Sequence, residues 1–176
     1  DGVTAPDFPS CWGKIGTTGA AYTQALTTMT APNALYMYSS STAATNLTYV
    51  SMPTVSTLQS GLYKLRFKLR ANSSTGGIVQ VGYLATSGDV TSFVSLGSYT
   101  ATSTTVPVEY SISNIVAPAG VTNLVFKHTG SPAYSLFIDD VFYELAPTCV
   151  EPTSVVASSI TTNSAALSWT APIVAP

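Results

Sequence analysis

In the segment Leu-Tyr-Lys-Leu-Arg-Phe-Lys-Leu-Arg at residues 62–70, apolar and basic side chains alternate strictly from Tyr63 to Arg70. Alternation with a period of two indicates a β-strand with one buried and one exposed face. A helix cannot bury such a pattern on one side, because its repeat is 3.6 residues. The apolar face consists of Tyr63, Leu65, Phe67 and Leu69, and the basic face of Lys64, Arg66, Lys68 and Arg70. The segment therefore predicts a sheet, and it places four of the six basic residues of the chain in one row.

The basic row has two interpretations. In the first, Lys64, Arg66 and Lys68 bind an acidic glycan or another protein. In the second, the row is a solvated sheet face, or a set of charges that keeps an edge strand from pairing with a neighbouring chain.

The same period of two recurs along the chain, and clusters of Gly, Pro, Asn and Ser separate the apolar runs. The predicted strands lie at residues 34–39, 47–52, 62–71, 78–85, 93–100, 106–112, 123–128 and 134–145. We expect almost no helix. Many short strands at this spacing predict an all-β sandwich or barrel.

Composition excludes two classes of partner. Only 8% of the residues are charged, the formal net charge is −2 and the pI is about 5.0, which argues against nucleic acid, since phosphates require a basic excess. No apolar run approaches the roughly 18 residues of a membrane span. The length of 176 residues allows one domain and a fragment of another.

The two cysteines, Cys11 and Cys149, bracket nearly all of the predicted strands. Either they form a disulfide that ties the two ends together, or they are independent thiols. The abundance of Ser and Thr suits an exported protein, in which oxidation is possible.

An enzyme is poorly supported by the sequence. His128 is the only histidine, and no neighbouring pattern makes a serine or cysteine nucleophile. We expect His128 at the surface, at the end of a strand. No Cys-x-x-Cys or His-x-x-x-His motif predicts a zinc site.

Two aspartates, Asp139 and Asp140, interrupt the apolar strand Leu-Phe-Ile-Asp-Asp-Val-Phe-Tyr-Glu at residues 136–144. A buried carboxylate needs a partner, so at least one of them is expected to reach solvent, a backbone network or a metal ion. In a regular strand the two point to opposite faces, which argues against a catalytic pair. We expect Asp140 to face inward, because it shares parity with Leu136 and Ile138.

The C-terminal part of the chain forms a second predicted unit. Residues 147–152 form a proline-bearing linker, and residues 153–176 resemble the first two strands of a fibronectin type III domain, with Trp169 at the position of the core tryptophan. Most of such a domain is missing, so the strand edges are expected to be exposed and able to recruit another protein chain.

The first part, residues 1–146, resembles the jelly-roll adhesin modules of Bacteroidetes-type secreted proteins, which are similar to MAM domains, cleaved-adhesin domains and carbohydrate-binding modules. The resemblance rests on ordered short motifs: Pro-Ser-Cys-Trp at 9–12, Ala-Leu-Tyr-Met at 34–37, Val-Ser-Met-Pro at 50–53, Val-Gly-Tyr at 81–83 and Phe-Ile-Asp-Asp-Val at 137–141. It implies a two-sheet antiparallel jelly-roll sandwich whose last long strand runs beside the first. It also implies a structural calcium ion, with Asp139 and Asp140 as ligands and further oxygens from Asp1 or Asp7.

The resemblance implies a secreted or bacterial cell-surface module that binds a polysaccharide or a cell-surface glycan. Tyr36 and Tyr38 are candidate sugar-stacking residues, because aromatic rings pack on the apolar face of a sugar. Either Leu35 and Met37 are buried and both tyrosines face outward, or the tyrosines belong to the core. Two functions therefore remain, an adhesive or carbohydrate-binding module and a structural spacer that only positions other domains.

Overall fold

The computed structural model describes residues 7–16, 18–147 and 153–170, and the chain divides into two compact units after Leu145. Among the described residues, no helix is long and apolar enough to cross a membrane.

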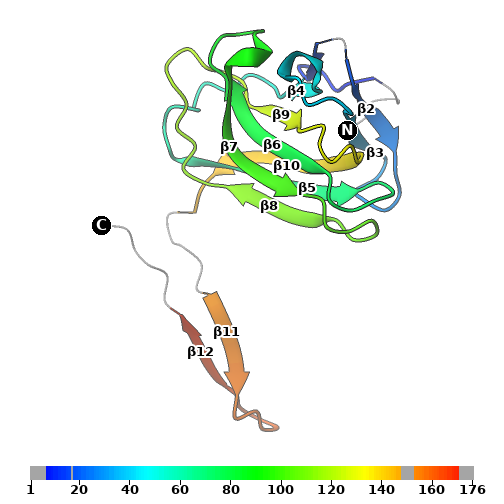
Figure 1. The fold of residues 1–176 in the computed structure, drawn as a ribbon. Coiled ribbons are helices and arrows are strands. Elements are labelled where there is room, and N and C mark those ends of the chain that lie inside the picture. The colour runs from blue at the N-terminus through cyan, green and yellow to red at the C-terminus, as the bar shows by residue number, and fades with distance from the viewer. Residues whose placement is uncertain (1–6, 17, 148–152, 171–176) are drawn as a thin grey trace. The chain divides into compact units, whose positions relative to one another are not determined.

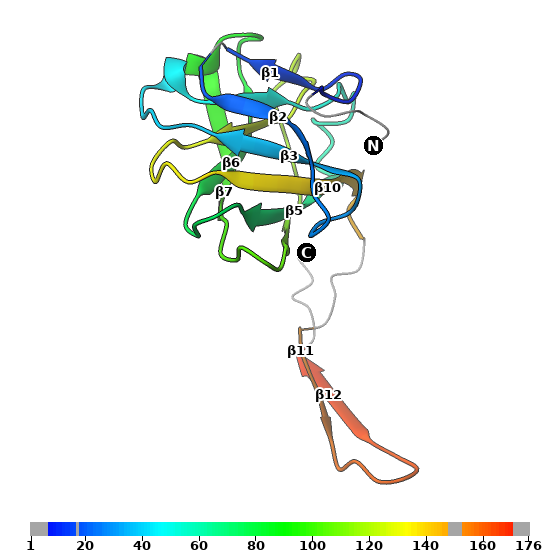
Figure 2. The same ribbon diagram turned by 90° about the vertical axis from the view of Figure 1, so that its right-hand side faces the viewer.

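The first unit is a sandwich of two antiparallel sheets (Figure 1). Sheet A contains, in spatial order, β1 (Gly13–Ile15), β4 (Tyr49–Ser51), β9 (Val125–His128), β6 (Ile78–Leu84) and β7 (Phe93–Thr100). Sheet B contains β2 (Ala20–Ala25), β3 (Asn33–Tyr38), β10 (Leu136–Leu145), β5 (Tyr63–Ala71) and β8 (Val108–Ile112). Figure 2 shows β2, β3, β10 and β5 side by side. Two short 3-10 turns, η1 (Ala44–Asn46) and η2 (Val90–Ser92), are the only helical segments of the described residues.

The predicted all-β sandwich is confirmed, and every strand predicted for this unit is present. The last long strand, β10, pairs with β3, which is the first of the predicted strands, and with β5 on its other side. The strands β1 and β2 were not predicted. Their sequences, Gly-Lys-Ile and Ala-Ala-Tyr-Thr-Gln-Ala, are short or rich in alanine, and both strands lie at sheet edges, where less of the side chain is buried.

The alternation of residues 62–70 places the apolar face of β5 in the core. Leu65, Phe67 and Leu69 are at most 1% exposed. Phe67 lies on sheet B and touches two rings of sheet A, with centroid distances of 5.2 Å to Phe126 on β9 and 5.2 Å to Tyr99 on β7. These contacts hold the two sheets together at the centre of the sandwich.

A β-bulge in β10 changes the phase of the strand at the paired aspartates. Asp139 is opposite Lys68 and Phe142 is opposite Arg66, so β10 advances by three residues where β5 advances by two. Asp140 has a φ of +48°, which is a left-handed conformation that Asp tolerates better than most residues. Leu136 and Ile138 face the core before the bulge, whereas Val141 and Tyr143 pack against it afterwards.

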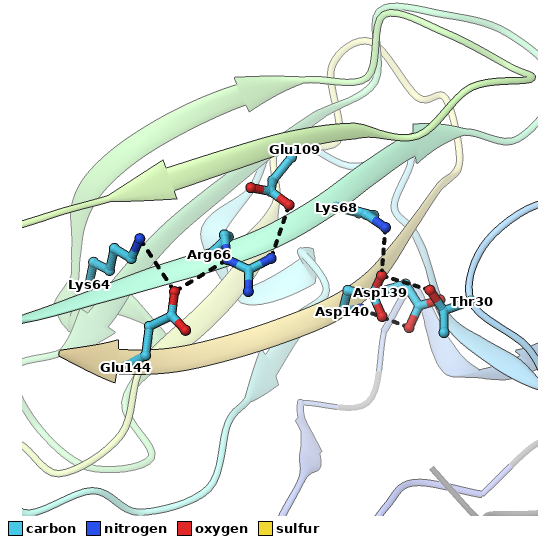
Figure 3. Close-up of polar contacts among 8 residues, drawn as sticks. All are labelled: Thr30, Lys64, Arg66, Lys68, Glu109, Asp139, Asp140 and Glu144. Carbon is cyan, nitrogen blue, oxygen red and sulfur yellow. Dashed lines mark hydrogen bonds and ion pairs between the residues drawn. The ribbon is translucent and has the colours of Figure 1, made fainter. Parts of the chain in front are cut away.

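The bulge overturns the expectation that Asp140 faces inward in a regular strand. The buried carboxylate belongs to Asp139, which is 8% exposed, and Asp140 is only half-buried. The side chains of Asp139 and Asp140 also lie side by side, rather than pointing to opposite faces of the sheet (Figure 3).

His128 ends β9, as predicted, but it is fully buried, so the expectation of a surface histidine was wrong. The Gly130 backbone N–H donates to Nδ1 at 2.9 Å, and Nε2 lies 2.9 Å from the Tyr134 carbonyl oxygen. Nδ1 must therefore be unprotonated, and Nε2 carries the proton that it donates to Tyr134. Burial lowers the pKa of His128, because the charged imidazolium is poorly solvated there.

This histidine is expected to make the protein less stable in mild acid. The folded-state pKa lies below the ordinary value of about 6.5, so the unfolded chain takes up a proton first as the pH falls. Stability is then lost progressively below about pH 6.5, and urea unfolding at pH 7.5 and pH 5.0 measures the loss. In a His128→Gln variant, the free energy of unfolding should differ less between pH 7.5 and pH 5.0 than it does in the parent protein, since His128 is the only histidine. An equal difference in both proteins would contradict this assignment.

The second unit contains an antiparallel hairpin of β11 (Thr153–Ser158) and β12 (Ala166–Thr170). Two strands were predicted here, and two are present. Trp169 lies on β12 and is 58% exposed. The assignment of this hairpin to a fibronectin type III domain remains a prediction, and the predicted linker lies mostly outside the described residues.

Candidate functional site

Asp139 carries a buried carboxylate that is only partly hydrogen-bonded. Its Oδ1 accepts a hydrogen bond from the Asp140 backbone N–H at 2.8 Å. Its Oδ2 is buried and has no hydrogen-bond partner among the described residues. Burial raises the pKa of Asp139, because removing water disfavours the ionised form.

Asp140, in contrast, is fully engaged by its neighbours. Its Oδ2 lies 2.8 Å from Lys68 Nζ and accepts a hydrogen bond from the Thr30 hydroxyl at 2.7 Å (Figure 3). The hydrogen bond from Lys68, and then that from Thr30, lowers the pKa of Asp140. This carboxylate therefore serves to attach the β2–β3 loop, which contains Thr30, to β10.

Both aspartates line a cavity of about 300 Å³. Its lining is mostly apolar and combines strands β2, β3 and β10 with the segment before β1: Phe8, Pro9, Trp12, Thr23, Asn33, Ala34, Leu35, Ile138, Asp139, Asp140, Val141 and Phe142. Thr23 was not nominated from the sequence because β2 was not predicted, and Asn33 was missed because it lies on β3 one residue before the strand predicted at 34–39. Their position opposite the Ile-Asp-Asp-Val motif becomes apparent only once the strand pairing is known.

The other predicted metal ligands are less well placed. Asp7 approaches the cavity by its backbone, since its carbonyl oxygen accepts a hydrogen bond from the Thr23 hydroxyl. Asp1 lies outside the described residues. Among the residues that the structure describes, no group of three or more Asp, Glu, His or Cys side chains gathers around one point.

The basic row on β5 is matched by carboxylates from the two flanking strands (Figure 3). Lys64 Nζ lies 3.3 Å from a Glu144 oxygen, and Arg66 lies 3.0 Å from Glu109 and 3.3 Å from Glu144. Lys68 pairs with Asp140, as described above. The last member of the row, Arg70, is buried and donates to the Thr104 carbonyl oxygen. The other three cations of the row are therefore neutralised within the sheet.

Leu35 and Met37 face the main core, and Tyr36, on the other face of β3, packs against a smaller buried cluster with Ala34 and Phe137. The ring of Tyr36 is already covered on its flanks: it stacks on Tyr22 at 4.8 Å and meets the edge of Phe137 at 5.6 Å. Tyr38 lies 6.3 Å from the His128 ring. These contacts leave little of the Tyr36 ring face for a sugar.

The predicted disulfide stays untested. Cys11 is exposed, and Cys149 lies outside the described residues.

The fold defines a class of module. No family model and no curated protein matches the sequence, but solved structures match the fold. The K1 cleaved adhesin domain of Lys-gingipain from Porphyromonas gingivalis W83 is 17% identical, with 80% of this chain and 94% of that domain covered and a TM-score of 0.61.

Two carbohydrate-binding modules share the same architecture. The CBM22-1 xylan-binding domain of Paenibacillus barcinonensis Xyn10C is 10% identical over 76% of this chain and 85% of its own, with a TM-score of 0.55. TmCBM61, solved in complex with β-1,4-galactotriose, is 15% identical over 78% and 90%, with a TM-score of 0.54. At these identities the comparisons confirm the jelly-roll fold that the sequence motifs indicated.

Proposed function

We propose that this chain is a non-catalytic module of a larger secreted or bacterial cell-surface protein, and that it mediates adhesion or carbohydrate binding. The observation that carries the proposal is the fold. A cleaved adhesin domain and two carbohydrate-binding modules share it over nearly their whole length. Function is carried by sites on a fold, so the proposal depends on a ligand being found.

The chemistry of the described residues supports a module without catalysis. Both ring nitrogens of the single histidine are hydrogen-bonded within the protein, so His128 is not available as a general base. The carboxylates of Glu109, Glu144 and Asp140 are each paired with a cation. Of the two carboxylates that line the cavity, Asp139 is the one without an ion pair to a described residue.

A structural spacer is the second candidate, and the contacts on sheet B favour it. The cations of the basic row are paired within the sheet, and the ring of Tyr36 is packed between two other rings. A spacer needs no free recognition groups, whereas a glycan-binding face does.

A glycan array separates the two candidates. A binding module is expected to retain at least one class of oligosaccharide above background, and a spacer is expected to retain none. Tyr36→Ala and Arg66→Ala test the residues nominated from the sequence: because their rings and charges are internally paired, each should change retention less than about tenfold. If no glycan of any class is retained, the binding function is abandoned and the spacer remains.

We also propose that the Asp139 cavity holds a structural calcium ion. The unsatisfied Oδ2 of Asp139 supports this, because Ca²⁺ prefers carboxylate, amide and carbonyl oxygens and relieves the cost of burying an ionised carboxylate. Asp139 would be the principal ligand, with Asn33 and backbone carbonyl groups near Asp7 as candidates beside it. The role of Asp140 would be to hold the Thr30 loop in place.

For the second unit we propose contact with further protein strands. Ala157 pairs with Leu167, and alternation places Trp169 on the same face of the hairpin as Leu167. Leu167 and Trp169 are both at least 58% exposed in the chain described here. An isolated two-stranded hairpin is marginally stable in water, so this apolar face is suited to pack against other strands, as in a fibronectin type III sandwich.

A further inference from the structure

The two sheets differ in how they distribute charge. Glu109, Asp139, Asp140 and Glu144 lie on strands of sheet B, whereas no described strand of sheet A contains an Asp or Glu. Lys64, Arg66 and Lys68 therefore find carboxylates on neighbouring strands, whereas Arg70 is buried and donates to the Thr104 carbonyl oxygen. A cation on sheet A has no such partner within its own sheet.

Lys127, on the central strand β9 of sheet A, is such a cation. Its Nζ makes no hydrogen bond or ion pair to any residue that the structure describes; it lies 4.8 Å from the centroid of the Phe93 ring and 6.0 Å from that of Tyr49. Burial against these rings lowers the pKa of Lys127. The other lysine on the described strands of sheet A, Lys14, donates to the Gly19 carbonyl oxygen.

Two polar side chains continue from Lys127 across the same face. Gln80 on β6 is directly opposite Lys127, and Ser98 on β7 is directly opposite Gln80. Residues paired in this way point to the same side of a sheet, with Cβ atoms about 4.5–5.5 Å apart. Within the described part of the chain, neither the Gln80 amide nor the Ser98 hydroxyl has a hydrogen-bond partner.

This face consists of an unpaired ammonium group, an amide and a hydroxyl in a row, beside the half-buried ring of Phe93. A partly desolvated charge with no ion pair detracts from stability, and residues that break a folding rule in this way are often retained for function. The row has the donors that a charged or hydroxyl-rich ligand requires. The basic row of sheet B lacks such free donors, because Lys64, Arg66 and Lys68 are paired with carboxylates and Arg70 is buried.

We infer that the outer face of sheet A around Lys127 is the ligand-binding face, and that it takes an acidic saccharide. The Lys127 ammonium group would pair with a carboxylate or sulfate on the sugar, Gln80 and Ser98 would bond to its hydroxyl groups, and Phe93 would contact its apolar side. The inference rests on the proposed carbohydrate-binding function and names the ligand class and the face.

The test compares the outer faces of sheet A and sheet B by replacing one lysine on each with methionine, which removes the charge and keeps the side-chain length. Calorimetric titration would use an oligogalacturonate and its fully methyl-esterified form, which share a backbone and differ in charge, together with a sulfated and an unsulfated oligosaccharide of one sequence. The protein is expected to bind the charged member of at least one pair more tightly, and less tightly as salt is raised. Lys127→Met should weaken that binding by about tenfold to a hundredfold, as expected for the loss of a hydrogen bond to a charged group.

Two matched variants serve as controls. Lys64→Met removes the same charge from sheet B and should leave the affinity unchanged, and Lys127→Arg, which keeps the charge, should retain most of it. Lys127→Met should also unfold at the same temperature as the parent protein or higher, because it removes an unpaired and partly buried charge, so a weakened titration cannot be ascribed to misfolding.

The outcomes separate this inference from the proposed function. If the protein binds glycans and Lys127→Met leaves the affinity unchanged, or if only neutral members are bound, the inference is overturned and the carbohydrate-binding function stands. If no oligosaccharide on the array or in the titrations is bound, the proposed function itself is overturned.

Discussion

Replacing Phe67 with alanine should lower the free energy of unfolding by about 3–5 kcal/mol, as expected when a fully buried phenylalanine is truncated. Phe67 is 0% exposed, and its ring meets Tyr99, Tyr110 and Phe126 at centroid distances of 5.2 to 6.0 Å. The neighbouring side chains come from three other strands, so they cannot all move inward to fill the space. Urea unfolding followed by tryptophan and tyrosine fluorescence measures the loss.

Phe142→Ala is the matched control for this experiment. Phe142 is 45% exposed and its ring lies under the Arg66 guanidinium, with 4.5 Å from the guanidinium carbon to the ring centroid. Its truncation leaves no internal cavity, so the free energy of unfolding should fall by no more than about 1 kcal/mol. Similar losses for the two variants would mean that Phe67 does not lie at the centre of the core.

Calcium should raise the temperature of unfolding, and Asp139→Asn should abolish this response. A ligand at a hundred times its dissociation constant stabilises a folded protein by about 2.7 kcal/mol, which is several degrees for a domain of this size. The asparagine side chain would keep the shape of the aspartate but not its charge, and a neutral amide binds Ca²⁺ more weakly than a carboxylate does. Thermal unfolding in calcium and in chelator measures the difference.

Asp140→Asn distinguishes a metal ligand from a structural aspartate. Its carboxylate is bonded to Lys68 and Thr30, so the variant should lose a little stability and still respond to calcium. Superimposable unfolding curves of the parent protein in calcium and in chelator would remove the calcium proposal. A response lost in Asp140→Asn but kept in Asp139→Asn would exchange the roles assigned to the two residues.

The sequence was sufficient to predict the sheet architecture, because alternation depends on a strand having one buried face. Leu65, Phe67 and Leu69 show this most clearly, since their burial follows directly from their spacing. The short edge strands β1 and β2 lack that signal. Consequently the cavity-lining residue Thr23 on β2 was missed, whereas Asn33 was missed because it precedes the strand predicted at 34–39.

The assignment of the aspartates failed for a different reason. The prediction assumed a regular strand, whereas one extra residue in β10 shifts the inward-facing positions from Leu136 and Ile138 to Val141 and Tyr143. This change of parity is present in the sequence on either side of the Asp-Asp pair. It indicates a bulge only when the neighbouring strand is known, because a bulge is recognised by an extra residue that has no partner on that strand.

Lys127 was missed because nothing in its local sequence distinguishes it. Its significance comes from the absence of Asp and Glu in the five described strands of sheet A, which are far apart in the chain and become neighbours only in the folded sheet. The basic row drew attention for the opposite reason. Its residues are close in sequence, and the carboxylates that neutralise them come from β8 and β10.

The paired charges on sheet B have a consequence for how copies of this module behave when they are crowded together. Lys64, Arg66 and Lys68 face an equal number of carboxylates, on Glu109, Asp140 and Glu144. The surface is therefore strongly hydrated but carries almost no net field, so it neither repels an identical neighbour nor attracts a polyanion. A protein that displays many such modules side by side can keep these faces in close proximity without self-association, and leave selectivity to the opposite side of each sandwich.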